Sequence, residues 1–412
     1  MKKLISLLLL LCLLLSFAGC GEAAPAETTA ATETVTATLS AEDMAILAQR
    51  RDIAEGYMRH MATIMWRAGE SVDYFKGEGD LHIVEGRLYR GIPYAYAAGN
   101  DAVFLGFSGG EDEKDIHQIS GLTMDLMGRN DDKVRRVGND CSGSILVSWA
   151  QVATSFASKN TQFMVPENGF IRVGEYKSSD TDNAKSKEMC VENGPIVMYN
   201  AYAQLQKADA VVHRTATYGH VMMVTSVHVE YNSKGNIDGN ASYVTTLHQT
   251  NGYLQKEAKA YDEAFGEDVY QTFGIDDKVT FFELYNDGYL PITCLEFVDP
   301  NATMLEVSIE DSIADPTVDD LYKGEFNSTH FISIVDVTVK NAAGEVVQQV
   351  RGFGERAHFN TFLLTEFVEY PTRVVGGLDI EALEPGEYTV TYEVEVVTGE
   401  RVVVRQITFT AQ

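Results

Sequence analysis

The chain has 412 residues, of which 45% are hydrophobic and 22% charged, a composition that supports folded globular domains. Its formal net charge is −28 at pH 7. A surface this acidic repels nucleic acid phosphates and anionic lipid headgroups, so we expect no nucleic acid partner.

The N-terminus has the pattern of an export signal. Lys2 and Lys3 precede an apolar run that reaches Phe17 and is followed by small residues and Cys20. The run is too short for a membrane-spanning helix and fits a secretory signal over residues 1–20. Its end resembles the lipobox of bacterial lipoproteins, which implies cleavage before Cys20 and a lipid on that cysteine; an uncleaved anchor is the alternative. Either way, the remaining chain is expected outside the cytoplasmic membrane.

A tether and a helix are expected next. Residues 21–39 consist mainly of Ala, Thr, Glu and Pro, the composition of a disordered segment. Ser40 then fits the N-cap of a helix that continues toward Gly69. We expect this helix to pack on the following domain through an apolar face. The residues of that face are Met44, Leu47, Ile53, Tyr57, Met61, Ile64 and Met65.

The stretch 138–156 predicts a second helix, with Cys141 at its start. Four apolar residues behind the cysteine recur at intervals of four, three and four positions, which indicates an amphipathic helix with one buried face. Asp140 or Asn139 is a suitable N-cap. The four apolar residues are Ile145, Trp149, Val152 and Phe156.

A cysteine in this position is a candidate nucleophile. Unpaired backbone N–H groups at a helix start favour a thiolate, and a lowered thiol pKa distinguishes a reactive cysteine from an inert one. A base from another part of the chain would complete the pair. The alternative is a small buried residue at a helix end.

Two histidines, His220 and His248, are candidates for the residues that act with this cysteine. Residues 218–230 predict a buried strand, and His220 near its start is expected to face outward at the end of a sheet, where a cleft can form. His248 lies opposite His220 if the hairpin between them turns near Lys234, and well apart from it if the turn is at 238–239. Both registers stay open, as does the alternative that His248 is a structural residue of its strand.

These segments together resemble the NlpC-type cell-wall cysteine peptidases, which are papain-like enzymes that cut peptide bonds in peptidoglycan stems. The resemblance covers roughly residues 88–293 and is carried by Gly91-Ile-Pro-Tyr94, Asn139-Asp-Cys-Ser-Gly143, residues 205–212 and Gly219-His-Val221. It implies Cys141 as nucleophile, His220 as base and His248 as the residue that orients the base.

The same resemblance implies a substrate and oxyanion region. Tyr94 would lie beside the thiol as a hydrogen-bond donor, Asp140 would meet the substrate amine, and Ser142 would stand at the helix start whose N–H groups face the oxyanion. Ser144 departs from the family, which usually has an aromatic residue there, so the chain would be a divergent member.

No metal or other cofactor is expected. The chain has no His-Glu-x-x-His pair and no clustered Cys and His spacing. Once Cys12 leaves with the signal and Cys20 carries the lipid, Cys141, Cys190 and Cys294 form an odd set, so one free thiol is expected. Whether Cys190 and Cys294 are paired stays open.

Beyond residue 300 the pattern changes to short alternating runs separated by turns. It predicts a β-sandwich of immunoglobulin-like size over residues 301–412. One expected strand covers residues 359–368, and the final hairpin covers 387–397 and 401–410. In its first strand one face is expected to consist of Tyr388, Val390, Tyr392, Val394 and Val396. Wall binding, a partner surface and a spacer are all open roles for this domain.

The sequence therefore predicts an α+β protein: a papain-like catalytic domain over residues 40–300, followed by an all-β sandwich. We expect a monomer that hydrolyses peptide bonds in peptidoglycan stem peptides. One alternative is a non-catalytic surface binding lipoprotein on a peptidase-like scaffold. Another is a Cys-His amidase or acyl transferase that acts on a different substrate.

Overall fold

The computed structural model describes residues 39–71, 83–95, 117–119, 138–353, 360–369 and 374–412. The chain divides into two units, Met1–Ser40 and Ala41–Gln412, and nearly all described residues belong to the second. The expected signal, Cys20 and the tether up to residue 38 lie outside the described residues. No helix in the described part of the chain is long and apolar enough to cross a membrane.

The first long helix, α2, covers Ala41–Thr63. Its buried stripe is narrower than expected, since Met44 and Ile53 are 55% and 46% exposed. The helix also ends before Met65, which begins strand β1 (Met65–Ala68). The prediction of a continuous apolar face toward Gly69 was therefore wrong, because a helical period was continued through residues that pair in a sheet.

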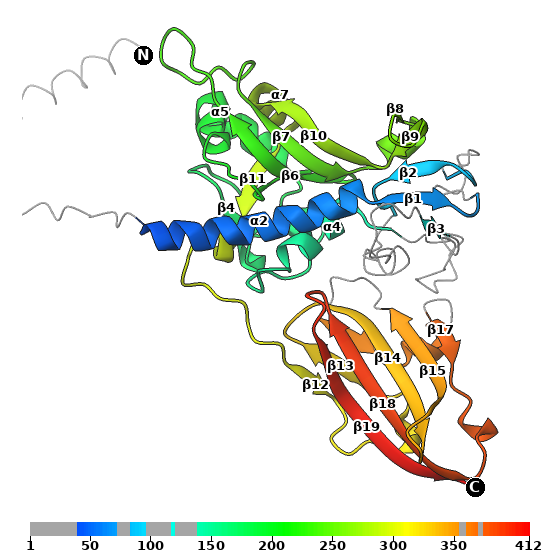
Figure 1. The fold of residues 1–412 in the computed structure, drawn as a ribbon. Helices are drawn as coiled ribbons and strands as arrows, with labels where there is room; N and C mark the ends of the chain where they lie inside the picture. Colours follow the sequence, from blue (N-terminus) through cyan, green and yellow to red (C-terminus); the bar gives the residue numbers. More distant parts are fainter. Residues whose placement is uncertain (1–38, 72–82, 96–116, 120–137, 354–359, 370–373) are drawn as a thin grey trace, which may run out of the picture. The chain divides into compact units, whose positions relative to one another are not determined.

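A six-stranded sheet forms the centre of the N-terminal part of this unit (Figure 1). Its strand order is β10-β7-β6-β5-β11-β4, and all neighbouring strands are antiparallel. Helix α4 (Cys141–Trp149) packs on β6 and β7, and α2 packs on α4, β7 and β10. The strands are β4 (Ile171–Arg172), β5 (Ala210–Arg214), β6 (Gly219–His228), β7 (Tyr243–Gln249), β10 (Phe273–Thr280) and β11 (Leu290–Thr293).

Helix α4 covers Cys141–Trp149 and is shorter than predicted. Each of its residues is buried, so it is a core helix and not an amphipathic one with a single buried face. Val152 and Phe156 are also buried, but they lie in the irregular chain after the helix. The apolar spacing thus predicted burial correctly and helix length incorrectly.

The polar segment after residue 177 contains a helix that the sequence pattern did not predict. Helix α5 covers Ser186–Tyr202 and is kinked at Gly194, which has φ of 78° and precedes Pro195. It packs on β5, β11 and α7. Two shorter helices are α6 (Gly252–Gln255) and α7 (Phe281–Asp287), and 3-10 turns lie at Thr161–Phe163, Pro166–Asn168, Leu295–Phe297, Val318–Asp320 and Ile380–Ala382.

A second, five-stranded sheet has the order β3-β1-β2-β9-β8. It joins strands that are far apart in the sequence, since β2 pairs in parallel with β9. The strands not yet given are β2 (Leu88–Arg90), β3 (His117–Ile119), β8 (Lys259–Asp262) and β9 (Glu267–Gln271).

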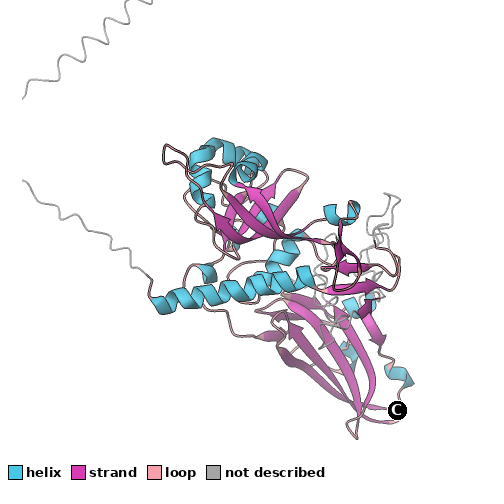
Figure 2. Ribbon diagram, turned by 45° about the horizontal axis from the view of Figure 1, so that its top comes forward, coloured by secondary structure: helices cyan, strands magenta, loops and turns pink. Residues whose placement is uncertain are grey.

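The C-terminal part consists almost entirely of strands, whereas the larger helices belong to the N-terminal part (Figure 2). A three-stranded sheet (β12-β13-β16) and a five-stranded sheet (β17-β15-β14-β18-β19) share one apolar core. The alternating face predicted for the last hairpin is confirmed by the burial pattern of β18. The strands are β12 (Ile309–Asp311), β13 (Glu325–Ser328), β14 (Ile332–Asn341), β15 (Val346–Phe353), β16 (Thr361–Leu363), β17 (Val374–Gly377), β18 (Gly386–Val396) and β19 (Arg401–Ala411).

The strand expected over residues 359–368 is largely wrong. Only β16 is extended, and the chain then turns into the short helix α8 (Glu366–Glu369). Leu364 in the turn and Phe367 in α8 are buried in the core, whereas Leu363 and Val368 are exposed.

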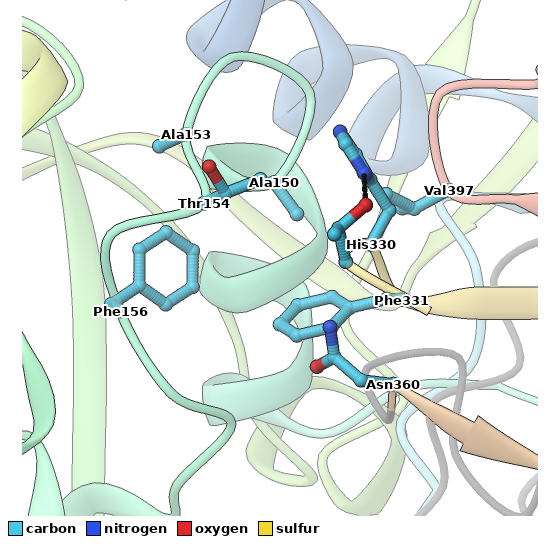
Figure 3. A pocket seen from close by; sticks show the side chains of 9 residues that line it. Ala150, Ala153, Thr154, Phe156, His330, Phe331, Asn360 and Val397 are labelled. Carbon is cyan, nitrogen blue, oxygen red and sulfur yellow. Dashed lines mark hydrogen bonds between the residues drawn. The ribbon is translucent and has the colours of Figure 1, made fainter. Parts of the chain in front are cut away.

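The C-terminal strands contact the chain that follows α4. Gln151 donates its side-chain N–H to the carbonyl of Val397 at 3.1 Å, and the rings of Phe156 and Phe331 meet edge to face with centroids 6.2 Å apart. A small cavity of about 20 Å³ lies between them, bordered also by His330 (Figure 3). This is room for about one water molecule.

Candidate active site

Cys141 is the first residue of α4, as the sequence predicts. The N-cap is Asp140, whose Oδ1 accepts hydrogen bonds from the backbone N–H of Gly143 at 2.6 Å and from the hydroxyl of Ser142 at 2.8 Å. These two bonds satisfy one of the free donors of the first turn and hold the chain extended before the helix. The cap therefore fixes the direction in which the side chain of Cys141 points from the helix start.

The Cys141 sulfur lies beside the strand that carries the candidate base. The backbone N–H groups near the sulfur act to lower the pKa of Cys141, foremost that of Val221, which directly follows His220. Burial nevertheless raises the pKa of Cys141 to about 12, and the charge of Asp140 acts in the same direction. The expectation of a lowered thiol pKa was wrong, because the backbone dipoles do not offset the loss of water around the sulfur.

His220 is buried, with 6% of its surface exposed, and does not face outward as expected. Burial lowers its pKa to about 3, and the neighbouring His248 and His213 add to this effect. His213 is its cross-strand partner on β5. The imidazole is therefore neutral at neutral pH.

The structure brings His248 to His220. Nε2 of His220 and Nδ1 of His248 are 3.0 Å apart, and the two rings are nearly perpendicular, at 70°. Met223 pairs with Leu247, and the loop closes through a bridge between Tyr231 and Ile237, so the turn lies near Lys234. Continuing that register makes His220 and His248 diagonal neighbours rather than directly opposite, a spacing that long side chains can bridge.

Two further residues that sequence reasoning missed extend this pair. Nε2 of His248 lies 3.0 Å from Oδ2 of Asp277 on β10, and the hydroxyl of Tyr253 is hydrogen-bonded to the same oxygen. The bond from His248 holds the pKa of Asp277 below its usual range. No local pattern marks Asp277, because its place beside His248 depends on the pairing of β7 with β10.

Gln249 joins three parts of the site. Its side chain is fully buried; Nε2 donates to the carbonyls of Ile92 at 2.9 Å and Pro93 at 2.8 Å, while Oε1 accepts from the hydroxyl of Ser144 at 2.6 Å. The residue after His248 thereby ties β7 to α4 and to the Ile-Pro segment. Ser144, the residue that departs from the family pattern, supplies one of these bonds.

Tyr94 is positioned next to the cysteine segment through its backbone. It forms an isolated parallel bridge with Asn139, two residues before Cys141, and the N–H of Asn139 donates to the carbonyl of Pro93 at 3.1 Å. Gly138 has φ of 151°, and a Cβ there would lie 2.2 Å from the same carbonyl oxygen. The two segments are therefore packed at a distance that only glycine allows.

No group of three or more His, Cys, Asp or Glu side chains in the described part of the chain is arranged to hold a metal ion. Among the described residues, Cys141, Cys190 and Cys294 are all free and buried, so no bridge joins Cys190 to Cys294. The open question of that pairing is answered by their separate packing in the core.

Comparisons with known proteins do not assign this site to a family. No protein-family model matches the chain, and no curated protein matches it. One solved structure, described as a tetra-tandem repeat in the extending region of a large adhesion protein, is 14% identical with a TM-score of 0.18. That match covers 50% of this chain and 66%, just under two thirds, of the other.

The described structure is thus a mixed α and β protein with more sheet than helix. Its candidate site is a buried thiol at a helix start, close to a hydrogen-bonded series that runs through His220, His248 and Asp277.

Proposed function

We propose that this chain is an exported cysteine peptidase that hydrolyses peptide bonds in peptidoglycan stem peptides. In this proposal residues 40–300 are a papain-like catalytic domain and residues 301–412 an immunoglobulin-like sandwich. The observation that carries it is the placement of Cys141 at the N-terminus of α4 beside the start of β6, where His220 is held by His248. The wall substrate rests on the resemblance of the motifs around these residues.

The reaction would begin with both groups neutral. As the Cys141 sulfur attacks the amide carbonyl, His220 takes the thiol proton, and the carbonyl oxygen becomes an oxyanion. Backbone N–H groups at the start of α4, including that of Ser142, would stabilise this charge. His220 then gives its proton to the leaving amine, and a thioester remains on the sulfur.

Hydrolysis completes the cycle. Water attacks the thioester with His220 again as the base, which releases a carboxylate and restores the thiol. His248 keeps the His220 ring in place through both steps. In this scheme Tyr94 borders the oxyanion, and Asp140 meets the amine of the substrate while it caps the helix.

We also propose that a lipid on Cys20 attaches the protein to the outer face of the cytoplasmic membrane, with residues 21–39 as a tether and the chain as a monomer. Mass spectrometry of the protein extracted from membranes should then show an N-terminal Cys20 that carries a lipid. A chain that still begins at Met1 would instead favour an uncleaved anchor.

The activity is tested with purified protein that begins after the signal and with isolated muropeptides. New products with one added water and a new free amine are expected, and Cys141→Ala should abolish them. Cys190→Ala is the matched control, because this buried thiol lies outside the site and its loss should leave turnover within about twofold of wild type.

A second candidate is favoured by the neutral state of the buried pair, since a raised thiol pKa is also what an inactive scaffold would have. If the wild-type protein binds muropeptides and forms no product, the result favours a non-catalytic binding protein. A product that joins the acyl group to an added amine would indicate an acyl transferase.

A further inference from the structure

We propose that Asp277, together with the Tyr253 hydroxyl, is a positioning group that fixes the tautomers of His248 and His220 and leaves Nδ1 of His220 as the proton acceptor. The inference rests on the proposed function. It adds to it the residue that determines which ring nitrogen does the chemistry.

The carboxylate of Asp277 determines where the proton of His248 lies. Oδ2 of Asp277 is contacted by two groups, the Tyr253 hydroxyl and Nε2 of His248 at 3.0 Å. An ionised carboxylate only accepts hydrogen bonds. Nε2 of His248 must therefore carry a proton.

The proton on His248 in turn determines which ring nitrogen of His220 carries a proton. In a neutral imidazole with a proton on Nε2, Nδ1 is an acceptor. Nδ1 of His248 lies 3.0 Å from Nε2 of His220, so His220 must donate from Nε2. Its own Nδ1 then holds the lone pair that a thiol proton requires.

The backbone of β10 is shaped to allow this contact. A bulge between Ile275 and Asp277 inserts Asp276, which has φ of 55°. In a strand without a bulge, residues three positions apart, such as Gly274 and Asp277, would lie on opposite faces. With it, the carboxylate reaches the face on which His248 lies.

Gly274 leaves the space in which the two groups meet. It is paired with His248 across the strands, and a Cβ at this position would lie 2.3 Å from Nε2 of His248 and 2.6 Å from Oδ2 of Asp277. Any side chain there would force the imidazole and the carboxylate apart. The absence of a side chain is thus part of the positioning device.

Protonation of His248 would reverse the arrangement. An imidazolium at His248 would donate from Nδ1, so Nε2 of His220 would become the acceptor and its Nδ1 would carry the proton. His213 faces His220, and Tyr253 and Asp276 face Asp277, with Arg59 bound to Asp276.

The test compares Asp277→Asn with Asp276→Asn in the complete exported protein. Asp276 is the adjacent carboxylate, but it binds Arg59 at 3.0 Å and not His248, and asparagine tolerates its left-handed backbone. Nitrogen-15 NMR of the histidine rings should show His220 and His248 as Nε2–H tautomers in the wild-type protein and in Asp276→Asn. In Asp277→Asn the amide N–H can face Nε2 of His248, and both rings should change to the Nδ1–H form.

The kinetic readout is the pH profile of muropeptide hydrolysis. Asp277→Asn should lower kcat roughly 10- to 100-fold with little change in KM and alter the acid limb of the profile. Asp276→Asn should leave both parameters within about twofold. Unchanged tautomers or an unchanged kcat in Asp277→Asn would overturn the positioning role.

A second variant guards against misfolding of the first. Gly274→Ala changes no polar group and should produce the same loss of kcat, whereas Gly377→Ala, a strand glycine whose Cβ would meet nothing within 4 Å, should not. Full activity of Gly274→Ala would count against the proposal. If the tautomers change as expected but the wild-type protein cleaves no muropeptide, the positioning inference is supported and the peptidase proposal fails.

Discussion

Cys141 and His220 each expose less than a tenth of their surface, 7% and 6%, and both are neutral near pH 7. The helix start and the neighbouring N–H groups favour the thiolate, but burial outweighs them. This differs from the thiolate expected at an exposed helix N-terminus. In the proposed mechanism the proton would therefore move from sulfur to imidazole during the attack and not before it.

One prediction concerns the reactivity of the thiol. Because burial raises the pKa of Cys141 to about 12, iodoacetamide should modify it at pH 7 more slowly than it modifies a free cysteine. Mass spectrometry of the Cys141 peptide over time measures the rate, and the unfolded protein is the control. Modification at pH 7 as fast as in the unfolded chain would contradict the neutral thiol.

A second prediction concerns stability and pH. The pKa of His220 falls from 6.5 to about 3 on folding, so between these values the unfolded state binds a proton that the folded state does not. The free energy of unfolding should therefore decrease as pH falls through this window, by up to about 1.4 kcal/mol per pH unit from this residue. Urea unfolding at pH 7 and pH 5 measures the slope.

His220→Gln provides the control for that slope. His213 and His330 also have pKa values lowered by burial and remain in the variant, so the difference between the two proteins isolates His220. An equal slope in both proteins would show that His220 is accessible to protons in the folded state.

At the scale of elements, Gln249 joins β7 to α4 and to the segment that precedes Tyr94. A buried amide that makes three hydrogen bonds to two other segments stabilises one arrangement of them. Ser144 supplies the donor for Oε1 of this amide, which is why a hydroxyl stands at that position of the helix.

Ser144→Ala should therefore lower the free energy of unfolding by about 1–3 kcal/mol, because it leaves a buried acceptor without its donor. Ser148→Ala is the matched control. Its hydroxyl is equally buried but donates to the backbone carbonyl of Ser144 at 2.7 Å, so we expect a loss below about 1 kcal/mol. Equal losses in the two variants, measured by urea unfolding, would argue against the role given to Gln249.

For the molecule as a whole, the contact between the C-terminal strands and the chain after α4 is a packed one. Phe331 is 5% exposed, belongs to the same core as Cys141 and meets Phe156 edge to face. A core that includes residues from both parts couples their unfolding.

Phe331→Ala should lower the free energy of unfolding by about 3–5 kcal/mol through the cavity it creates. The loss should be detected both by tryptophan fluorescence, because Trp66 and Trp149 lie in the core that includes Phe156, and by circular dichroism of the whole chain. Val403→Ala, at a residue that is 57% exposed, should change stability by less than about 1 kcal/mol. If the unfolding transition followed by tryptophan fluorescence is unchanged in Phe331→Ala, the two parts unfold independently.

The amino-acid sequence by itself determined the features that depend on near neighbours. The cap formed by Asp140 at the start of α4, the start of β6 at Gly219 and the alternating face of β18 follow from residues within a few positions of each other. Such signals act through one turn of helix or one strand period, so they can be read from the chain. The lengths of α2 and α4 could not, because tertiary packing ends both helices.

Only the tertiary structure decided the composition and the charge state of the site. Asp277 is 29 positions from His248, and the pairing of β7 with β10 brings them together. Ser144 is 105 positions from Gln249, and the packing of α4 on β7 brings them together. The raised pKa of Cys141 and the lowered pKa of His220 also depend on the tertiary structure. Burial removes water from both groups, and how deeply a residue is buried depends on the whole chain packed around it.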